Sequence, residues 1–508
     1  MTNNRIIKLD IVRTIAILNV VLCHCVERMY NMYNYDYIRT FSLLSRVCMM
    51  TLFTISRLGV PLFLFLSGAL LLKKTIEDDT SAIKFYKNNL LPLAIANALW
   101  NLIYTIYNHF MWGTSINVLE IIKEMLLLRA TAIDQLWYLP MIISLYIGVP
   151  IIAHIVKKFS FKIVSIIMVA IFAYRYIAPA LNNLFLVFGI EQSFSTGINI
   201  AFLGEAYGLY MLIGFYIYND QKEKRHNLIY ILITVVSCML MVMLQLYSLR
   251  SGSNYVYYVW YDFPLLIITA ASVFLLLNNI NESKIPKFIA KISVFISKMS
   301  FGIYVVHMAI LVWIEKIAVY INLSHLIKTL LCLGITFILS TLVVFIISRN
   351  KYLAKYLFVI KHWWFQSYDG YPWSISFGKN VPDTVKVRLT DIGTGKVWNF
   401  SKDYSDGEFY INNGGYGQTG CVIFVPDGLK LIKGSNFKVE ISDIGIDGYS
   451  DNLSYNVSIF SLLDKNGIYY EDGSWKISGG SVDFGYDGMY NSPTYGSWKI
   501  LGGSVVFN

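Results

Sequence analysis

The chain has 508 residues, of which 56% are hydrophobic and only 15% are charged. This composition, with a mean hydropathy of +0.53, argues against a soluble enzyme and is typical of a polytopic membrane protein. The net charge of +10 is unevenly divided, because residues 366–508 hold 11 basic and 16 acidic residues, a net of −5, which leaves +15 for residues 1–365. The basic excess therefore lies in the membrane part, where it sets orientation, and no nucleic-acid partner is implied.

The first apolar run, Arg5–Arg28, carries an unusual set of polar side chains. On a helix, Arg13 and His24 point about 20° apart, and Asp10 lies about 60° from Arg13, so the three share one side. Arg13 and His24 are also about 16 Å apart along the axis, half of a bilayer core. Ionisable groups inside a membrane are costly and usually face a bundle interior or an aqueous cavity. We therefore expect Asp10, Arg13 and His24 to belong to a functional site.

A plainer interpretation of the same run is a structural Asp10–Arg13 pair at i, i+3 with His24 at the water interface. A metal site at Cys23-His24-Cys25 is not expected, because adjacent helical residues diverge by about 100°. The run holds internal charges and lacks a small-residue cleavage site, so we expect it to stay as the first transmembrane helix.

About ten transmembrane helices are predicted from apolar runs near 20 residues. They are 9–26, 51–72, 90–112, 136–156, 162–180, 200–218, 227–248, 261–278, 299–319 and 326–348. The loops on one side hold 20 basic residues, against six on the other. The positive-inside rule then puts both ends of the helical bundle in the cytoplasm.

Polar residues within the second and third spans are candidate substrate- or donor-binding groups. Arg57 lies in an apolar stretch that continues to Ser67-Gly68, and either snorkels or has a buried partner. Asn97 and Asn101 belong to a polar stripe on the third span. Its side chains either form hydrogen bonds between helices or form the wall of a polar pocket.

Three more polar groups fall in later spans. Arg175 and Glu205 either pair with each other, or Glu205 lines the cavity. His307, on the ninth span, is either a satisfied core residue or a member of the site.

The composition changes after the last span. Residues 349–365 are too short and too charged to span a membrane and predict a basic-aromatic interfacial linker. Residues 366–508 alternate apolar and polar positions between Asn-Gly and Asp-Gly turns, which predicts a small all-β, sandwich-like domain. Since the intramembrane ionisable groups all precede it, we expect this domain to fold alone and to be dispensable for chemistry.

Five motifs occur in an order that resembles the membrane acyltransferase-3 family over about residues 5–348. They are Leu9-Asp10-(x)2-Arg13 with His24, Ser56-Arg57-(x)3-Pro61 leading to Ser67-Gly68, Leu136-Trp137-Tyr138, Gly208–Tyr216, and Ser300–Tyr304 with His307. The resemblance implies a domain of residues 1–348 that transfers acyl groups to bacterial surface polysaccharides. It assigns the functional pair to His24 and Arg13, and we add Asp10 to the catalytic group and Arg57 as the second-helix basic residue. One departure is Gln135, where many relatives have His.

The expected activity is O-acylation, most simply O-acetylation, of a cell-surface or lipid-linked glycan at the bacterial plasma membrane. The resemblance implies acyl-CoA, such as acetyl-CoA, as the cytoplasmic donor, with no bound cofactor or metal. The residue types fit, because neutral imidazole can take a hydroxyl proton and guanidinium can hold an oxyanion or the donor's phosphates. His24 either takes the acetyl group covalently or acts only as the base. The main alternative is a polysaccharide transporter of similar helical architecture. Another is the membrane half of an amino-acid-handling resistance protein.

Overall fold

The computed structural model describes residues 6–74, 76, 78–190, 194, 205–219, 227–250 and 259–360 and, beyond residue 371, the strands given below with residue 395. The chain divides into a helical unit, Ile6–Trp364, and a second unit that contains the residues from Phe365 onward.

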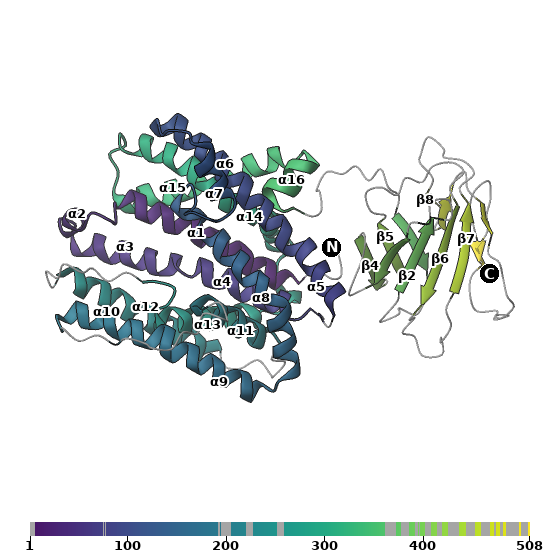
Figure 1. The fold of residues 1–508 in the computed structure, drawn as a ribbon, viewed down its shortest axis with the longest axis horizontal. Coiled ribbons are helices and arrows are strands. Elements are labelled where there is room, and N and C mark those ends of the chain that lie inside the picture. The colour runs from purple at the N-terminus through teal and green to yellow at the C-terminus, as the bar shows by residue number, and fades with distance from the viewer. Residues whose placement is uncertain are drawn as a thin grey trace. The chain divides into compact units, whose positions relative to one another are not determined.

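The helical unit consists of long helices joined by short surface helices (Figure 1). The α-helices are α1 Ile7–Met29, α2 Tyr35–Arg39, α3 Leu43–Ser56, α4 Gly59–Leu71, α5 Asp79–Phe85, α6 Leu91–Trp112, α7 Val118–Met125, α8 Tyr138–Lys158, α9 Phe161–Phe172, α10 Ala178–Phe188, α11 Glu205–Asn219, α12 Asn227–Arg250, α13 Pro264–Asn278, α14 Lys287–Ala318, α15 His325–Ile347 and α16 Lys351–Phe358. Short π- or 3₁₀-helical turns occupy Tyr86–Leu90, Asp134–Trp137, Ala173–Ile177 and Glu282–Lys284.

Eight helical segments in the described part of the chain are long and apolar enough to cross a membrane. The prediction of a polytopic helical bundle is therefore confirmed, whereas the number of long spans is smaller than the ten expected. The expected span 261–278 is the 15-residue helix α13. The expected span 200–218 begins on residues outside those described and continues as α11, also 15 residues.

Three spans begin well before their predicted starts, including the third, which begins at Asp79 instead of near residue 90. The second span starts at Leu43 and runs over 29 residues through α3 and α4. The ninth, α14, starts at Lys287 instead of near 299. Its first turns carry exposed lysines on one side and bury Ala290, Ser293 and Ser297 on the other. An amphipathic start of this kind escapes a search for continuous apolar residues.

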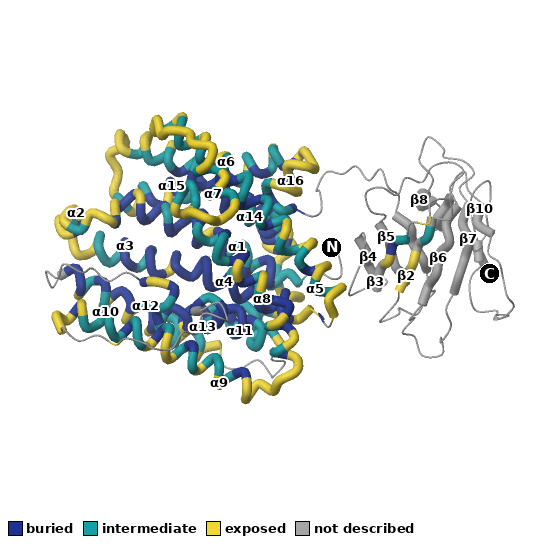
Figure 2. The backbone as a smooth tube through the Cα atoms, viewed as in Figure 1, coloured by how far each residue is buried: buried dark blue, intermediate teal, exposed yellow. Residues whose placement is uncertain are grey.

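Helix α1 lies at the centre of the helical unit. It packs against α3, α4, α13, α14 and α15, and its buried residues include Val12, Ile17, Val21 and Val26. Figure 2 shows the buried residues concentrated on α1 and α4, with exposed residues at α2 and along the outer helices. A helix that is buried on most of its sides presents its polar groups to other protein groups.

Close contact between α4 and α11 depends on two glycines. A Cβ on Gly68 would overlap the backbone carbonyl of Met211, and one on Gly214 would overlap the backbone carbonyl of Phe65. Small residues let helix backbones approach in this way inside a membrane. Since α4 also contributes residues to the wall of the cavity described below, the contact between α4 and α11 fixes the position of part of that wall.

Gly68→Ala is therefore expected to destabilise the helical unit by about 3 kcal/mol, the upper end for an overpacked core, because a backbone carbonyl cannot move aside easily. Thermal unfolding of the detergent-purified protein measures this. The matched control is Gly334→Ala on α15, where no atom lies within 4 Å of the added Cβ. Equal melting temperatures for the two variants would contradict the packing argument.

Two short helices lie at the surface of the helical unit. Helix α7 exposes Val118, Leu119 and Ile122, in keeping with the amphipathic character of its sequence. Helix α16 falls in the predicted linker and buries Ala354 and Phe358. The indole Nε1 of Trp100 on α6 donates a hydrogen bond to the Leu357 carbonyl at 2.8 Å. Residues 361–365 of the linker lie outside the described residues.

The second unit contains antiparallel strands. They are β1 Pro372–Ser376, β2 Lys386–Asp391, β3 Val397–Ser401, β4 Glu408–Asn413, β5 Thr419–Phe424, β6 Asn436–Ser442, β7 Leu453–Ser458, β8 Ile468–Glu471, β9 Ser474–Ile477, β10 Ser481–Asp483, β11 Ser497–Trp498 and β12 Val506–Phe507. One sheet has the order β1-β5-β4, another β10-β7-β6-β2-β3, and β8-β9 and β11-β12 form pairs. The sandwich-like packing of residues 366–508 stays a prediction.

Candidate active site

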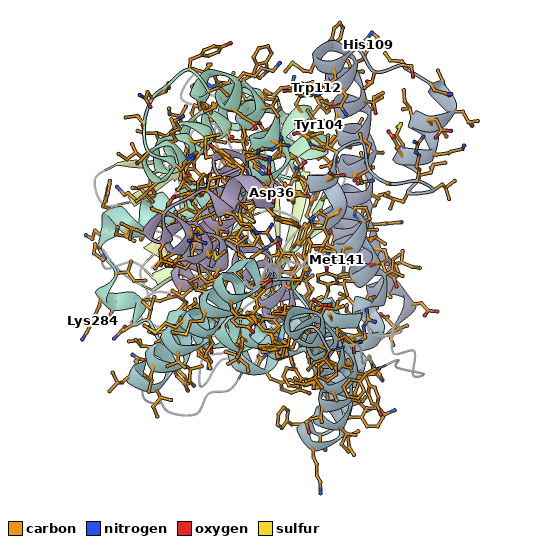
Figure 3. The ribbon with its side chains drawn as sticks, turned by 90° about the vertical axis from the view of Figure 1, so that its left-hand side faces the viewer. Asp36, Tyr104, His109, Trp112, Met141 and Lys284 are labelled. Carbon is orange, nitrogen blue, oxygen red and sulfur yellow. The ribbon has the colours of Figure 1, made fainter. Side chains whose placement is uncertain are left out.

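A cavity of about 280 Å³ lies inside the helical unit. Its wall combines residues from α1, α3, α4, α6, α8 and α14 with residues from the 134–137 turn and the 259–263 loop. The charged and imidazole side chains in the wall are Arg13, His24 and Arg57. Figure 3 shows the side chains with the helical unit turned by 90° from Figure 1, so that one end of the bundle faces the viewer and the exposed Lys284 lies at its periphery.

The cavity follows α1. Arg13 and His24 both line it, and they are eleven residues, or about 16 Å of helix, apart. The cavity therefore extends over about half the thickness of a bilayer's hydrocarbon core. The predicted common side of Arg13 and His24 is thus the side that faces one cavity.

At one end of the cavity, Arg13 is held by a hydroxyl bridge. Its Nη1 donates to the Ser297 Oγ at 3.0 Å, and that hydroxyl donates to the Asp10 Oδ1 at 2.6 Å. The direct Arg13–Asp10 separation is 4.0 Å. Asp10 is buried and does not line the cavity, and its contact with the cavity wall runs through Ser297 of α14 to Arg13.

At the other end, His24 is held by two neighbours. Its Nδ1 lies 2.7 Å from the Glu27 Oε2. Its ring stacks on that of His307, with centroids 5.3 Å apart and planes at 30°. His307 is fully buried and does not line the cavity. Its Nδ1 lies 2.5 Å from the Tyr304 carbonyl.

Arg57 is buried, with 6% of its surface exposed. Its guanidinium carbon lies 4.6 Å from the ring centroids of both Phe53 and Trp260, and its Nη1 donates to the Tyr261 hydroxyl at 3.2 Å. Arg57 therefore does not snorkel to the surface. A desolvated guanidinium between aromatic faces is strongly held and keeps its charge.

The remaining wall is polar and aromatic. The hydroxyl and amide side chains in it belong to Ser56, Ser67, Gln135 and Ser300. The Tyr304 hydroxyl donates to the Gln135 carbonyl at 2.7 Å, and Ser67 is hydrogen-bonded to Tyr146. The rings of Trp137 and Tyr261 lie 5.5 Å apart, and those of Tyr138 and Tyr304 lie 5.6 Å apart.

The asparagine stripe lies away from the cavity wall. Asn101 donates to the Asn97 carbonyl at 2.9 Å and accepts from the Ala132 amide at 2.8 Å. Both asparagines are fully or almost fully buried. These hydrogen bonds join α6 to the 131–133 loop and are structural contacts between elements. A binding role for Asn97 and Asn101 stays a prediction.

Arg175 interacts electrostatically with Asp262. The side chain of Glu205 lies outside the described residues, so neither its predicted pairing with Arg175 nor its predicted place in the cavity is tested. Burial raises the pKa of Asp262, while the charge of Arg175 lowers it.

Several residues of the site are absent from the sequence-based prediction. Glu27 was detectable, because it lies three residues after His24 on the same helix. Ser297 and Tyr261 were not, because their contacts with Arg13 and Arg57 span more than 200 residues of sequence.

A comparison with protein families matches residues 6–349 to the model described as Acyltransferase domain. Comparison with curated proteins and with solved structures yields no match. The family match covers more than half of the chain and nearly all of the helical unit that contains the cavity. The chain therefore belongs to the acyltransferase-3 family and is a membrane acyltransferase.

Proposed function

We propose that the protein transfers an acetyl group from acetyl-CoA to a hydroxyl of a cell-surface or lipid-linked glycan. The observation that carries the proposal is one cavity with an imidazole and two guanidinium groups in its wall, among which Arg13 and His24 lie at two depths along α1. The glycan acceptor and the acyl-CoA donor rest on the family resemblance and on this chemistry.

His24 is the general base in this proposal. A sugar hydroxyl attacks the thioester carbonyl, and the imidazole takes the hydroxyl proton as the new C–O bond forms. The C–S bond then breaks, and the proton passes from His24 to the departing thiolate. A positioned base of this kind contributes about 10²–10⁴-fold to the rate.

The two guanidinium groups have different partners, which suggests different tasks. Arg57 is enclosed by aromatic rings. Its charge acts on Cys23 and Glu27, the neighbours of His24 on α1, so it can stabilise the oxyanion that develops on the thioester carbonyl. Arg13 lies near the predicted cytoplasmic end of α1, where positive charge favours the phosphate-bearing donor. Asp10 and Ser297 keep Arg13 oriented for that task.

The cavity size limits what enters. Pockets that bind drug-sized ligands have volumes of about 300–1,000 Å³. A cavity of about 280 Å³ therefore suits the reacting ends of two substrates better than a whole nucleotide together with a sugar. The donor would insert its thioester arm from the cytoplasmic face, and the acceptor hydroxyl would enter from the outer face. Ser67 and the aromatic wall around Trp137 would contact these ends, since aromatic faces suit sugar rings.

The expected result is that purified protein in lipid vesicles transfers the acetyl group of radiolabelled acetyl-CoA to a sugar acceptor. The product is an ester, so mild base should release the label. Mass spectrometry of surface glycans from cells with and without the protein identifies the acceptor by the mass of added acetyl groups. The control is labelled free acetate, which lacks the thioester. Identical glycans in both cell types, together with no transfer in vesicles, would contradict the proposal. The transporter interpretation is not retained, because the chain belongs to an enzyme family.

A further inference from the structure

We propose that Glu27 is a positioning residue for His24: its carboxylate fixes the imidazole tautomer and orientation that leave Nε2 free to act as the base. This inference rests on the proposed function, since it assigns a task to His24 in acyl transfer. The family resemblance gives roles to His24 and Arg13 and leaves Glu27 without one.

The geometry of the pair is specific. Glu27 follows His24 by three residues, so both side chains lie on neighbouring positions of the α1 surface. The Glu27 Oε2 is 2.7 Å from the His24 Nδ1, with the two side chains 10% and 17% exposed, respectively. An ionised carboxylate only accepts hydrogen bonds, so the contact requires the proton on Nδ1. The other ring nitrogen, Nε2, then carries the free lone pair.

Glu27 is itself held by three neighbours. The Cys23 Sγ lies 3.8 Å from its Oε1, Tyr33 makes a side-chain hydrogen bond to it, and the Arg57 charge lies close enough to stabilise its charge. A buried carboxylate with donors and a counter-charge stays ionised and keeps its place. Glu27 is therefore a fixed acceptor for Nδ1.

His307 completes the arrangement from the other side. Its Nδ1 is fixed by the Tyr304 carbonyl at 2.5 Å, and its fully buried ring stacks on His24 at 5.3 Å. The stack limits rotation of the His24 ring, while the carboxylate selects its protonated nitrogen. The two contacts together restrict His24 to one rotamer and one tautomer.

The proton balance follows from this placement. The acceptor hydroxyl loses its proton to Nε2, and His24 becomes an imidazolium that is stabilised by the neighbouring carboxylate. Glu27 keeps its negative charge throughout and does not take the proton. The proton leaves from Nε2 to the thiolate that is released when the C–S bond breaks, so His24 returns to the neutral Nδ1–H form.

Glu27→Gln tests the inference, because the amide keeps the shape and can donate to Nδ1, which favours the tautomer protonated on Nε2. We expect kcat to fall by up to about 10⁴-fold, the effect of the carboxylate-to-amide change in a serine-protease triad. KM should change little, since Glu27 does not line the cavity. Glu27→Asp, which keeps the charge, is expected to recover part of kcat. The control is Glu315→Gln, which removes a carboxylate paired with Arg28 at the surface and is expected to leave kcat unchanged.

The outcomes separate this inference from the proposed function. Wild-type kcat in Glu27→Gln, alongside an inactive His24→Ala, would overturn the positioning role and leave the proposed function standing. An active His24→Ala would overturn both. A loss that appears only in KM, or an equal loss in the Asp and Gln variants, would show a structural role instead. If Glu27→Gln does not fold, Glu27→Asp provides the test. Its shorter side chain should lower kcat by about 10²-fold, and wild-type kcat would contradict the inference.

Discussion

His24→Ala is expected to lower the turnover number by about 10²–10⁴-fold, the contribution of a positioned general base. In the part of the chain that the structure describes, His24 is the histidine in the cavity wall. His307 lies behind it, fully buried and outside that wall. No neighbouring imidazole is therefore placed to take over when the His24 ring is removed.

Acetyl transfer from labelled acetyl-CoA in lipid vesicles measures this effect. The matched control is His154→Ala on α8, an exposed histidine, which is expected to turn over at the wild-type rate. His24→Gln, which keeps much of the side-chain volume, separates loss of the base from loss of packing against His307. Both His24 variants should elute from a sizing column like the wild type. Full activity in either variant would remove His24 from the reaction.

Arg57→Lys is expected to lower kcat by about 10²–10³-fold, the usual effect of removing one donor from an oxyanion site. Lysine keeps the charge but loses the planar group that fits between Phe53 and Trp260. An ammonium is also more strongly hydrated, so it is more costly to bury at a site that is 6% exposed. A conservative change at this position should thus have a large effect.

The matched control is Arg28→Lys, whose side chain is 41% exposed and pairs with Glu315. We expect no change there, because surface ion pairs contribute little and either cation can form one. Tyr261→Phe isolates the hydrogen bond to the Arg57 Nη1, and should cost less than Arg57→Lys because the guanidinium remains. Equal turnover in Arg57→Lys and Arg28→Lys would reduce Arg57 to a structural residue.

The helical membrane fold and the common side of Arg13 and His24 were predictable from the sequence. Both follow from local rules: apolar length sets a span, and 3.6 residues per turn set which side chains face together. The contact between Glu27 and His24 is also predictable from local rules, because the two residues are three positions apart on one helix. The family resemblance, carried by motifs within residues 5–348, is confirmed by the family match over residues 6–349.

Which polar groups meet depends on how the helices pack. Asp10 shares a helical side with Arg13, yet it reaches Arg13 through Ser297 on α14 and stays out of the cavity. The Arg57 partners Trp260 and Tyr261 lie about 200 residues further along the chain. Periodicity shows which face of a helix is polar. The packing of whole helices determines which residues of a neighbouring helix that face contacts. That packing depends on contacts such as the Gly68–Met211 approach of α4 and α11, which no local pattern contains.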